Sequence, residues 1–245
     1  SGLYWERTGR TPNSLFVIIT TRNRIYQFVG DETLEQLFAS YDAYSEFQEI
    51  PDGRIMHNDL AVCRKNGKAE NFAWLTGPGI FHGSVCFDAE GGKMLNDAEL
   101  LYYSSSELVS GEVTTENSLP ISLCLSPYYF LLLYPNRVMC VSTISKQCMF
   151  EQELPQSAGV PRRIARDGRT GTVLIATDRA VLELVISRED ADVWSLLLDK
   201  KDWNGAVTMC KGDQQKLNTV YITQAEELFE QKRYKEAALC FAKTI

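Results

Sequence analysis

Apolar and polar positions divide the chain into two regimes that meet near residue 190. Up to about Ser187, short apolar runs are separated by turn residues, a spacing typical of β-strands. From Asp190 onward, apolar residues recur three or four positions apart, and this spacing predicts amphipathic helices. We therefore expect a mainly β domain over residues 1–187, followed by an α-helical domain over residues 188–245.

One unit recurs in the first regime: an apolar run, a tight polar or glycine turn, and a second apolar run. Equivalent positions of successive copies lie 56, 58 and 42 residues apart, and a propeller blade needs roughly 40–50 residues plus its loops. The first two steps carry the insertions 31–45 and 88–96. The four copies are residues 16–28, 72–81, 130–141 and 173–184.

This spacing predicts a WD40-like β-propeller, because radial repetition leaves only short, protected strand edges. A β-sandwich is the alternative, and it would require shorter and more even strand spacing. Most propellers have more than four blades, so we expect the chain to be a fragment that carries the later blades.

The second regime indicates four helices, at residues 193–198, 203–210, 217–229 and 234–241. Asp192 or a neighbouring acidic residue is expected to cap the first of them. Ala225, Leu228 and Phe229, followed by Tyr234, Ala237 and Phe241, resemble a tetratricopeptide-type helical hairpin. One hairpin cannot bury both of its faces, so residues 188–245 are predicted to begin an α-solenoid.

Composition narrows the function classes. The formal net charge is −7 and the pI about 5.0, so no basic field is present to hold a nucleic acid. The most apolar stretch, residues 128–134, is too short to cross a bilayer, so we expect peripheral membrane association through partners. The cysteine count is odd and lacks a C-x-x-C pair, which favours a reducing cytosol. The seven are Cys63, Cys86, Cys124, Cys140, Cys148, Cys210 and Cys240.

Candidate chemistry is sparse. His82 lies in an apolar hairpin and is predicted to be a packed strand residue, while His57 is predicted to be a solvated loop residue. The cluster at residues 77–79, Gly-Pro-Gly, lacks the Lys-Ser/Thr of a phosphate loop and predicts a turn. Gly91 and Gly92 indicate flexibility in the second insertion. We predict no catalytic, cofactor-binding or metal-binding residue in this chain.

Charged clusters offer two further hypotheses. Glu189, Asp190 and Asp192 are expected to complement a helix N-terminus rather than to bind a metal. Basic residues gather at two places, which we interpret as solvated faces, with docking to an acidic partner or anionic lipid as the alternative. These residues are Arg162, Arg163, Arg166 and Arg169, and then Lys232, Arg233 and Lys235.

An ordered set of segments resembles the deep-orange family of vacuolar sorting subunits. Clathrin heavy chain, coatomer-like coats and intraflagellar transport proteins share the propeller-then-solenoid order, but these segments favour the deep-orange family. The segments are residues 16–30, 37–41, 71–74 with 79–80, 130–133 with 136–138, 188–194, 198–199, 225–226, 231–234 and 240–241.

The resemblance implies a non-catalytic scaffold subunit of the HOPS and CORVET tethering complexes, on the cytosolic face of late endosomes, lysosomes or vacuoles. It implies contact with other vacuolar sorting subunits, and indirect contact with a Sec1/Munc18-type protein, SNAREs and Rab GTPases. Zinc is expected only in a RING finger downstream of this chain. Alternatives are a coat or intraflagellar transport subunit, a propeller hydrolase, or a ubiquitin ligase acting through that RING finger.

Overall fold

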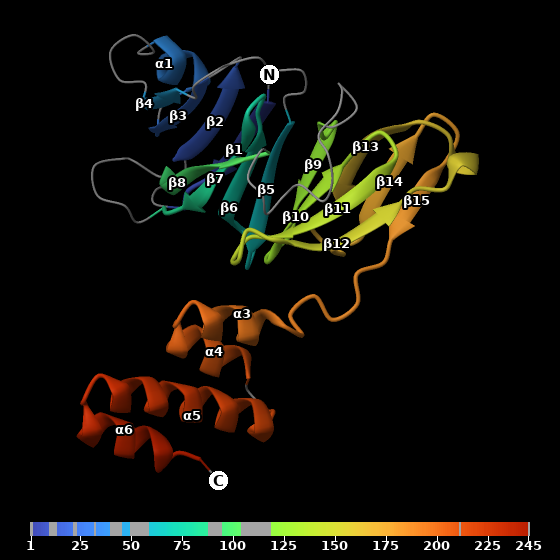
Figure 1. Cartoon of the computed structure of the whole chain (residues 1–245). Coiled ribbons are helices and arrows are strands. Elements are labelled where there is room, and N and C mark those ends of the chain that lie inside the picture. Colours follow the sequence, from blue (N-terminus) through green and yellow to red (C-terminus); the bar gives the residue numbers. More distant parts are fainter. Residues whose placement is uncertain are drawn as a thin grey trace. The chain divides into compact units, whose positions relative to one another are not determined.

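A computed structural model describes residues 2–9, 14–21, 24–31, 33–39, 46–49, 59–87, 95–103, 119–210 and 212–244. The chain divides into two compact units, Ser1–Val185 and Ile186–Ile245. The described part of the first unit consists mainly of antiparallel sheets, and that of the second consists of helices (Figure 1). The predicted order, strands first and helices afterwards, is confirmed.

The described strands form four sheets, and within each sheet the strands pair in chain order. A short helix, α1 (Leu34–Ala39), lies between the third and fourth strands, and a 3-10 turn, η3 (Gln156–Ala158), follows the twelfth. The sheets comprise β1 (Gly2–Arg7), β2 (Leu15–Thr21), β3 (Arg24–Gly30) and β4 (Glu46–Glu49); β5 (Asp59–Lys65), β6 (Lys68–Leu75), β7 (Gly79–Val85) and β8 (Leu95–Tyr102); β9 (Ser122–Leu125), β10 (Tyr129–Leu133), β11 (Arg137–Ser142) and β12 (Cys148–Glu153); and β13 (Pro161–Arg166), β14 (Val173–Thr177) and β15 (Val181–Leu184).

Each predicted hairpin is the second and third strand of one sheet. The four hairpins are β2–β3, β6–β7, β10–β11 and β14–β15, all antiparallel and in the predicted order. The predicted pairing of two strands is therefore confirmed for all four copies. The first turn, at residues 22 and 23, lies outside the described residues, as do much of both predicted insertions and the pair Gly91 and Gly92.

Apolar clusters between successive sheets hold the first unit together. In β10, Phe130 and Leu132 pack toward the second sheet, whereas Leu131 and Leu133 pack toward the fourth. Successive residues of a strand point to opposite faces, so a sheet covered on both sides needs an unbroken apolar run. Burying one such Leu or Phe side chain contributes about 1.5–3 kcal/mol, which explains why these runs dominate the sequence pattern.

The second unit contains α3 (Val193–Asp199), α4 (Trp203–Met209), α5 (Gln214–Glu230) and α6 (Tyr234–Phe241). Ala206, Cys210 and Val220 form the buried core between α4 and α5, and Trp194 packs against it from α3. Tyr234 packs its ring edge-on against Phe229 at 5.0 Å, where α5 turns into α6. Continuation of these helices as a solenoid stays a prediction.

One predicted cap is confirmed in position but not in its side-chain hydrogen bond. Asp192 does occupy the N-cap position of α3, but its side chain makes no capping hydrogen bond to any described residue. Its backbone carbonyl instead accepts bonds from Ser195 and Leu196. Side-chain caps occur at the next two helices, where Asp202 accepts from the Gly205 amide and Asp213 from the Lys216 amide. These two caps satisfy amide groups that the helix itself leaves open.

The turn between β6 and β7 depends on close backbone packing. The Thr76 amide donates to the Gly79 carbonyl at 2.9 Å, and the Thr76 hydroxyl donates to the same oxygen at 2.5 Å. A Cβ atom on Gly79 would collide with the Leu101 carbonyl group and lie 2.9 Å from Tyr102 Cα. The predicted turn is confirmed, and the missing side chain allows β8 to pair with β7 at this point.

Replacing this glycine should destabilise the first unit. We expect Gly79→Ala to lower the free energy of unfolding by about 1–3 kcal/mol, because backbone atoms cannot move aside as a flexible side chain would. Gly168→Ala is the matched control, since a Cβ at Gly168 meets nothing within 4 Å. Urea denaturation measures both variants, and equal unfolding midpoints would contradict the steric argument.

Candidate functional site

A polar hub joins the first strands of three sheets. Asp59, at the start of β5, accepts hydrogen bonds from the Ser122 hydroxyl at 2.6 Å and the Leu123 amide at 3.2 Å. Its other oxygen accepts from Arg163 in β13 at 3.1 Å. The Ser122 hydroxyl also accepts from the Ile164 amide at 3.2 Å. We call Asp59, Ser122 and Arg163 the inner-strand hub, because they connect β5, β9 and β13.

The two charged members of the hub, the anionic Asp59 and the cationic Arg163, differ in solvent exposure. The Asp59 side chain is 14% exposed, whereas the Arg163 side chain is 69% exposed. A carboxylate withdrawn from water needs hydrogen-bond donors, and here a serine hydroxyl and a backbone amide supply them. The exposed arginine adds little, because solvent screens its charge. The hub therefore depends mainly on the contact between Asp59 and β9.

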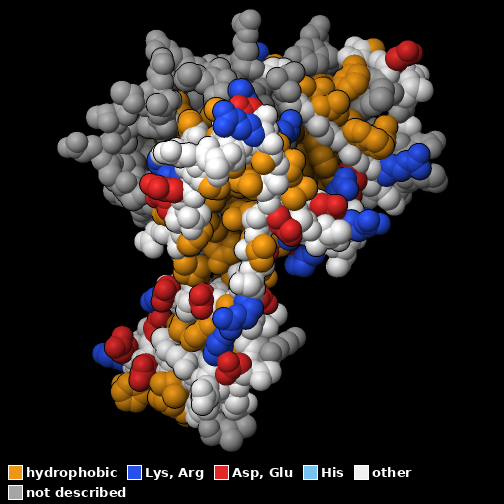
Figure 2. Space-filling view, turned by 90° about the vertical axis from the view of Figure 1, so that its right-hand side faces the viewer, with side chains coloured by type: hydrophobic (Ala, Val, Ile, Leu, Met, Phe, Trp, Pro, Cys, Tyr) orange, Lys and Arg blue, Asp and Glu red, His pale blue; other side chains and the backbone are white. Residues whose placement is uncertain are grey.

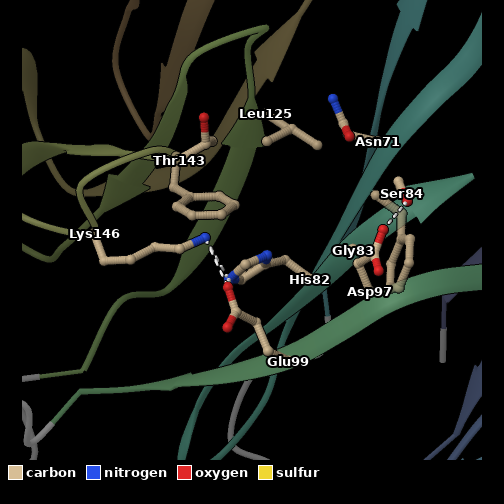
Figure 3. Close-up of a pocket in the computed structure, with 11 residues that line it drawn as sticks. Asn71, His82, Gly83, Ser84, Asp97, Glu99, Leu125, Thr143 and Lys146 are labelled. Atoms are coloured by element: carbon tan, nitrogen blue, oxygen red, sulfur yellow. Dashed lines mark hydrogen bonds and ion pairs between the residues drawn. The ribbon is translucent and has the colours of Figure 1, made fainter. Parts of the chain in front are cut away.

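A cavity of about 260 Å³ lies between the second and third sheets, lined by residues from β6–β10 and from the turn after β11 (Figure 3). Phe72, Leu125 and Phe130 give it an apolar part. Ser84 donates to Asp97 at 3.3 Å on the opposite side from Lys146. The cavity therefore combines aromatic surface with charged groups at its rim.

Three side chains form a polar bridge across this cavity. Lys146, from the turn after β11, lies 3.1 Å from His82 Nε2 in β7 and 3.0 Å from Glu99 Oε1 in β8 (Figure 3). Burial is the main reason that the pKa of His82 falls to about 4, and the Lys146 ammonium lowers it further. The imidazole is therefore neutral near pH 7, so that Nε2 accepts a hydrogen bond from Lys146.

His82 is thus buried within a strand, and the prediction of a packed strand residue is confirmed. Its ring lies 4.8 Å from the Phe130 ring, which fixes it between the two sheets. His57 lies outside the described residues. Among the described residues, no group of three or more His, Cys, Asp or Glu side chains is placed to hold a metal ion.

Three of the four residues of the first predicted basic cluster lie on β13, and two of the four bond within their own unit. Arg163 belongs to the hub, and Arg166 Nε donates to the Gly171 carbonyl at 3.3 Å within its own turn. Arg162 and Arg169 are exposed. Two of the four side chains are therefore engaged by their own unit, which weakens the docking-patch alternative.

The second basic cluster surrounds the turn between α5 and α6. Arg233 forms a paired contact with the carboxylate of Glu236, with distances of 2.8 and 2.5 Å. Lys232 adopts a left-handed backbone conformation at the turn, and Lys235 is exposed. The acidic residues Glu189 and Asp190 precede α3, as predicted.

The sequence predicts free cysteine thiols and contains no apolar stretch long enough to cross a bilayer. None of the seven cysteines, all of which are described, forms a disulfide. Within the described residues, no helix is both long and apolar enough to cross a bilayer.

Sequence reasoning did not find the hub or the bridge. The partners of Asp59 lie 63, 64 and 104 positions away, and Lys146 lies 64 positions from His82. No local motif marks these residues, because their neighbours are set by the packing of one sheet on the next. The only available signal is position, since Asp59 and Ser122 each begin the first strand of a repeat.

The described antiparallel sheets pack against one another in chain order, as the blades of a β-propeller do, and the hub joins the first strands of three of them. The chain belongs to the family described as the Pep3/Vps18/deep orange beta-propeller domain, whose model matches residues 1–186. The predicted fold class and the family resemblance are confirmed.

Individual relatives of the chain support the same family assignment. The chain is 30% identical over 239 residues to the vacuolar protein sorting-associated protein 18 homolog of Danio rerio, covering 94% of this chain and 24% of that protein. It is 34% identical to the vacuolar sorting protein 18 of Arabidopsis thaliana, covering 93% and 24%. The chain therefore spans about a quarter of the length of the curated relatives that it matches.

Among solved structures, the chain is similar to the Cps50 (Swd1) beta-propeller domain of Myceliophteria thermophila. The TM-score is 0.44 and the sequence identity 11%, with 75% of this chain and 53% of that chain covered.

The hub predicts unequal costs for its members. Asp59→Ala should lower the free energy of unfolding by about 1–3 kcal/mol, because it leaves the Leu123 amide without an acceptor and the Ser122 hydroxyl with only the Ile164 carbonyl at 3.4 Å. Arg163→Ala should cost less than about 1 kcal/mol, because its side chain is exposed. Denaturant titration of both variants provides the measurement. A larger loss for the arginine variant would show that the ion pair, not the contact with β9, holds the hub.

The bridge predicts a pH dependence through His82. The folded pKa of about 4 lies below the unfolded value of 6.5, so its stabilising contribution is complete above pH 6.5 and is lost as the pH falls to about 4. The loss amounts to about 3 kcal/mol for a shift of this size. We expect His82→Gln to lose less stability than the parent chain over this range, as measured by urea denaturation at several pH values. Parallel stability curves would exclude His82 as the titrating group.

Proposed function

We propose that this chain is a non-catalytic scaffold subunit of the HOPS and CORVET endolysosomal tethering complexes, which support vesicle tethering and membrane fusion. The match of residues 1–186 to the deep-orange propeller model carries this proposal. The names of the relatives, vacuolar sorting proteins in an animal and a plant, support the same assignment.

The packing supports a structural role. Apolar clusters fill the spaces between successive sheets, and the inner-strand hub links three of these sheets. A unit tied together in this way deforms little, which suits a part that holds partner subunits at fixed separations. In our proposal, tethering arises from this rigidity combined with several binding surfaces.

The surface of the propeller unit offers area for such contacts. Figure 2 shows hydrophobic side chains spread over one face of this unit, with Lys, Arg, Asp and Glu side chains around them. Apolar areas rimmed by polar groups are common at protein–protein contacts. We propose that the partners are other vacuolar sorting subunits, through which a Sec1/Munc18-type protein, SNAREs and Rab GTPases are contacted indirectly.

Location and cofactor follow from the same proposal. The chain would act at the cytosolic face of late endosomes, lysosomes or vacuoles, held there by partner proteins. It would bind no cofactor itself. Zinc and any ubiquitin-ligase activity would belong to a RING finger elsewhere in the longer protein.

Affinity purification of the protein at its native level, followed by mass spectrometry, tests this function. We expect to recover the sibling vacuolar sorting subunits and a Sec1/Munc18-type partner. Recovery of coatomer or intraflagellar transport components would assign the chain to those assemblies instead. Recovery of no stable partner would contradict a scaffold role of either kind.

Two variants sharpen the purification. Leu132→Asp places a charge in the core between the second and third sheets, so it should unfold the propeller unit and abolish partner recovery. Lys65→Ala is the matched control, because it removes only an exposed ion pair with Glu70. Unchanged recovery with Leu132→Asp would mean that the propeller unit does not hold the partners.

A further inference from the structure

The cavity between the second and third sheets contains a hydrogen-bond donor without an acceptor. A lysine ammonium can only donate, so His82 Nε2 accepts in its 3.1 Å contact with Lys146 Nζ. The imidazole is neutral near pH 7, and its one hydrogen is therefore on Nδ1. Among the described residues this N–H group has no acceptor, although the His82 side chain is only 9% exposed. A buried donor of this kind calls for an acceptor from outside.

This donor is directed into the cavity. Figure 3 shows Nε2 of His82 turned toward Lys146 and the second ring nitrogen pointing away from it, toward the space beside Leu125. Phe72 and Phe130 line the same space with aromatic surface. A ligand that supplies the acceptor must therefore also carry an apolar part, which can pack against these rings.

An irregularity of the second sheet places a carboxylate at the same cavity. Between two successive paired positions, β8 contains one residue more than β7, which is a β-bulge. Asp97 in this bulge has a φ of 50°, in the left-handed region that few residues other than Gly, Asn and Asp adopt. The bulge approaches β7 so closely that a Cβ atom on Gly83 would lie 2.6 Å from the Asn96 carbonyl oxygen. Bulges redirect side chains, and the side chain of Asp97 lines the cavity.

The charges around the cavity leave an excess of negative charge. Glu99 Oε1 lies 3.0 Å from Lys146 Nζ, so these two charges offset each other. Asp97 lies on the opposite side, where its only hydrogen bond within the described part of the chain comes from the Ser84 hydroxyl at 3.3 Å. A cationic group is therefore the complementary partner for this carboxylate.

We propose that the cavity binds an arginine residue of a peptide segment. The guanidinium pairs with Asp97, and the main-chain carbonyl of the arginine accepts from His82 Nδ1. The aliphatic stem lies against Phe72 and Phe130. Arginine suits this site better than lysine, because a planar guanidinium forms two parallel bonds to a carboxylate and stacks on aromatic rings. The site rests on the geometry of two adjacent sheets, independently of which complex contains the chain.

Labelling the histidines with an NMR-active nitrogen isotope tests the proposal, because the chain contains only His57 and His82. In the parent chain at pH 7, His82 should be in its Nδ1–H form. Titration with the acetylated peptide amide Gly-Arg-Gly should shift the Nδ1 signal of His82 and leave that of His57 unchanged. An Nε2–H form before titration, or an unchanged His82 signal up to about 10 mM peptide, would overturn the proposal.

Two comparisons isolate the guanidinium contact. A peptide with citrulline in place of arginine keeps the shape without the charge, and it should bind at least about tenfold more weakly. Asp97→Asn should weaken binding of the arginine peptide by a similar factor, and asparagine tolerates the positive φ at this position. Asp199→Asn is the matched control, because it removes the same charge from an exposed position on α3, and it should bind within about twofold of the parent chain.

The contrary results are equally clear. Equal binding of the citrulline peptide, or equal binding by the Asp97→Asn chain, would show that no guanidinium pairs with this carboxylate. Equal binding of a lysine peptide would overturn the assignment to arginine.

A last comparison identifies the source of the arginine segment. If a separate protein supplies it, the longer protein should bind the arginine peptide with the same affinity as the 245-residue chain. A His82 signal that is already shifted in the longer protein, and that peptide does not move further, would support the site and assign its occupant to a segment of the longer protein itself.

Discussion

The arrangement of β5, β9 and β13 depends on the hydrogen bonds that the Asp59 carboxylate accepts. Apolar clusters supply most of the stabilising energy between sheets, but apolar contact is non-directional and tolerates sliding. A carboxylate bonded to the Ser122 hydroxyl at 2.6 Å has defined partners and geometry. Because Ser122 also accepts from the Ile164 amide, the constraint passes from the second sheet to the fourth. One carboxylate that is largely shielded from solvent thus helps to set how three sheets align with one another.

The same packing explains why the hairpins could be predicted. A strand covered on both faces must be apolar at consecutive positions, and residues 130–133 show such a run. The turns are equally local, since the Thr76 amide and hydroxyl both bond to the Gly79 carbonyl three residues along the chain. Both signals lie within a few residues of each other, so the sequence alone reveals the second and third strands of every sheet.

The hub and the bridge could not be predicted, because their members come together only after the sheets have packed. Arg163 illustrates the difficulty: in sequence it belongs to a basic cluster, whereas in the structure it pairs with Asp59, 104 positions away. His82 was predicted to be packed, but its bond to Lys146 depends on the next sheet. Asp192 also shows that an acidic residue at a helix start need not cap it with its side chain.

The bridge at His82 shows how polar side chains connect two neighbouring sheets. The cavity beside His82 is crossed by the bridge to Lys146 and Glu99, which joins the second and third sheets. Burial keeps the imidazole neutral near pH 7, so its Nε2 accepts the hydrogen bond from Lys146. This polar contact therefore adds direction to the apolar cluster that packs the two sheets together.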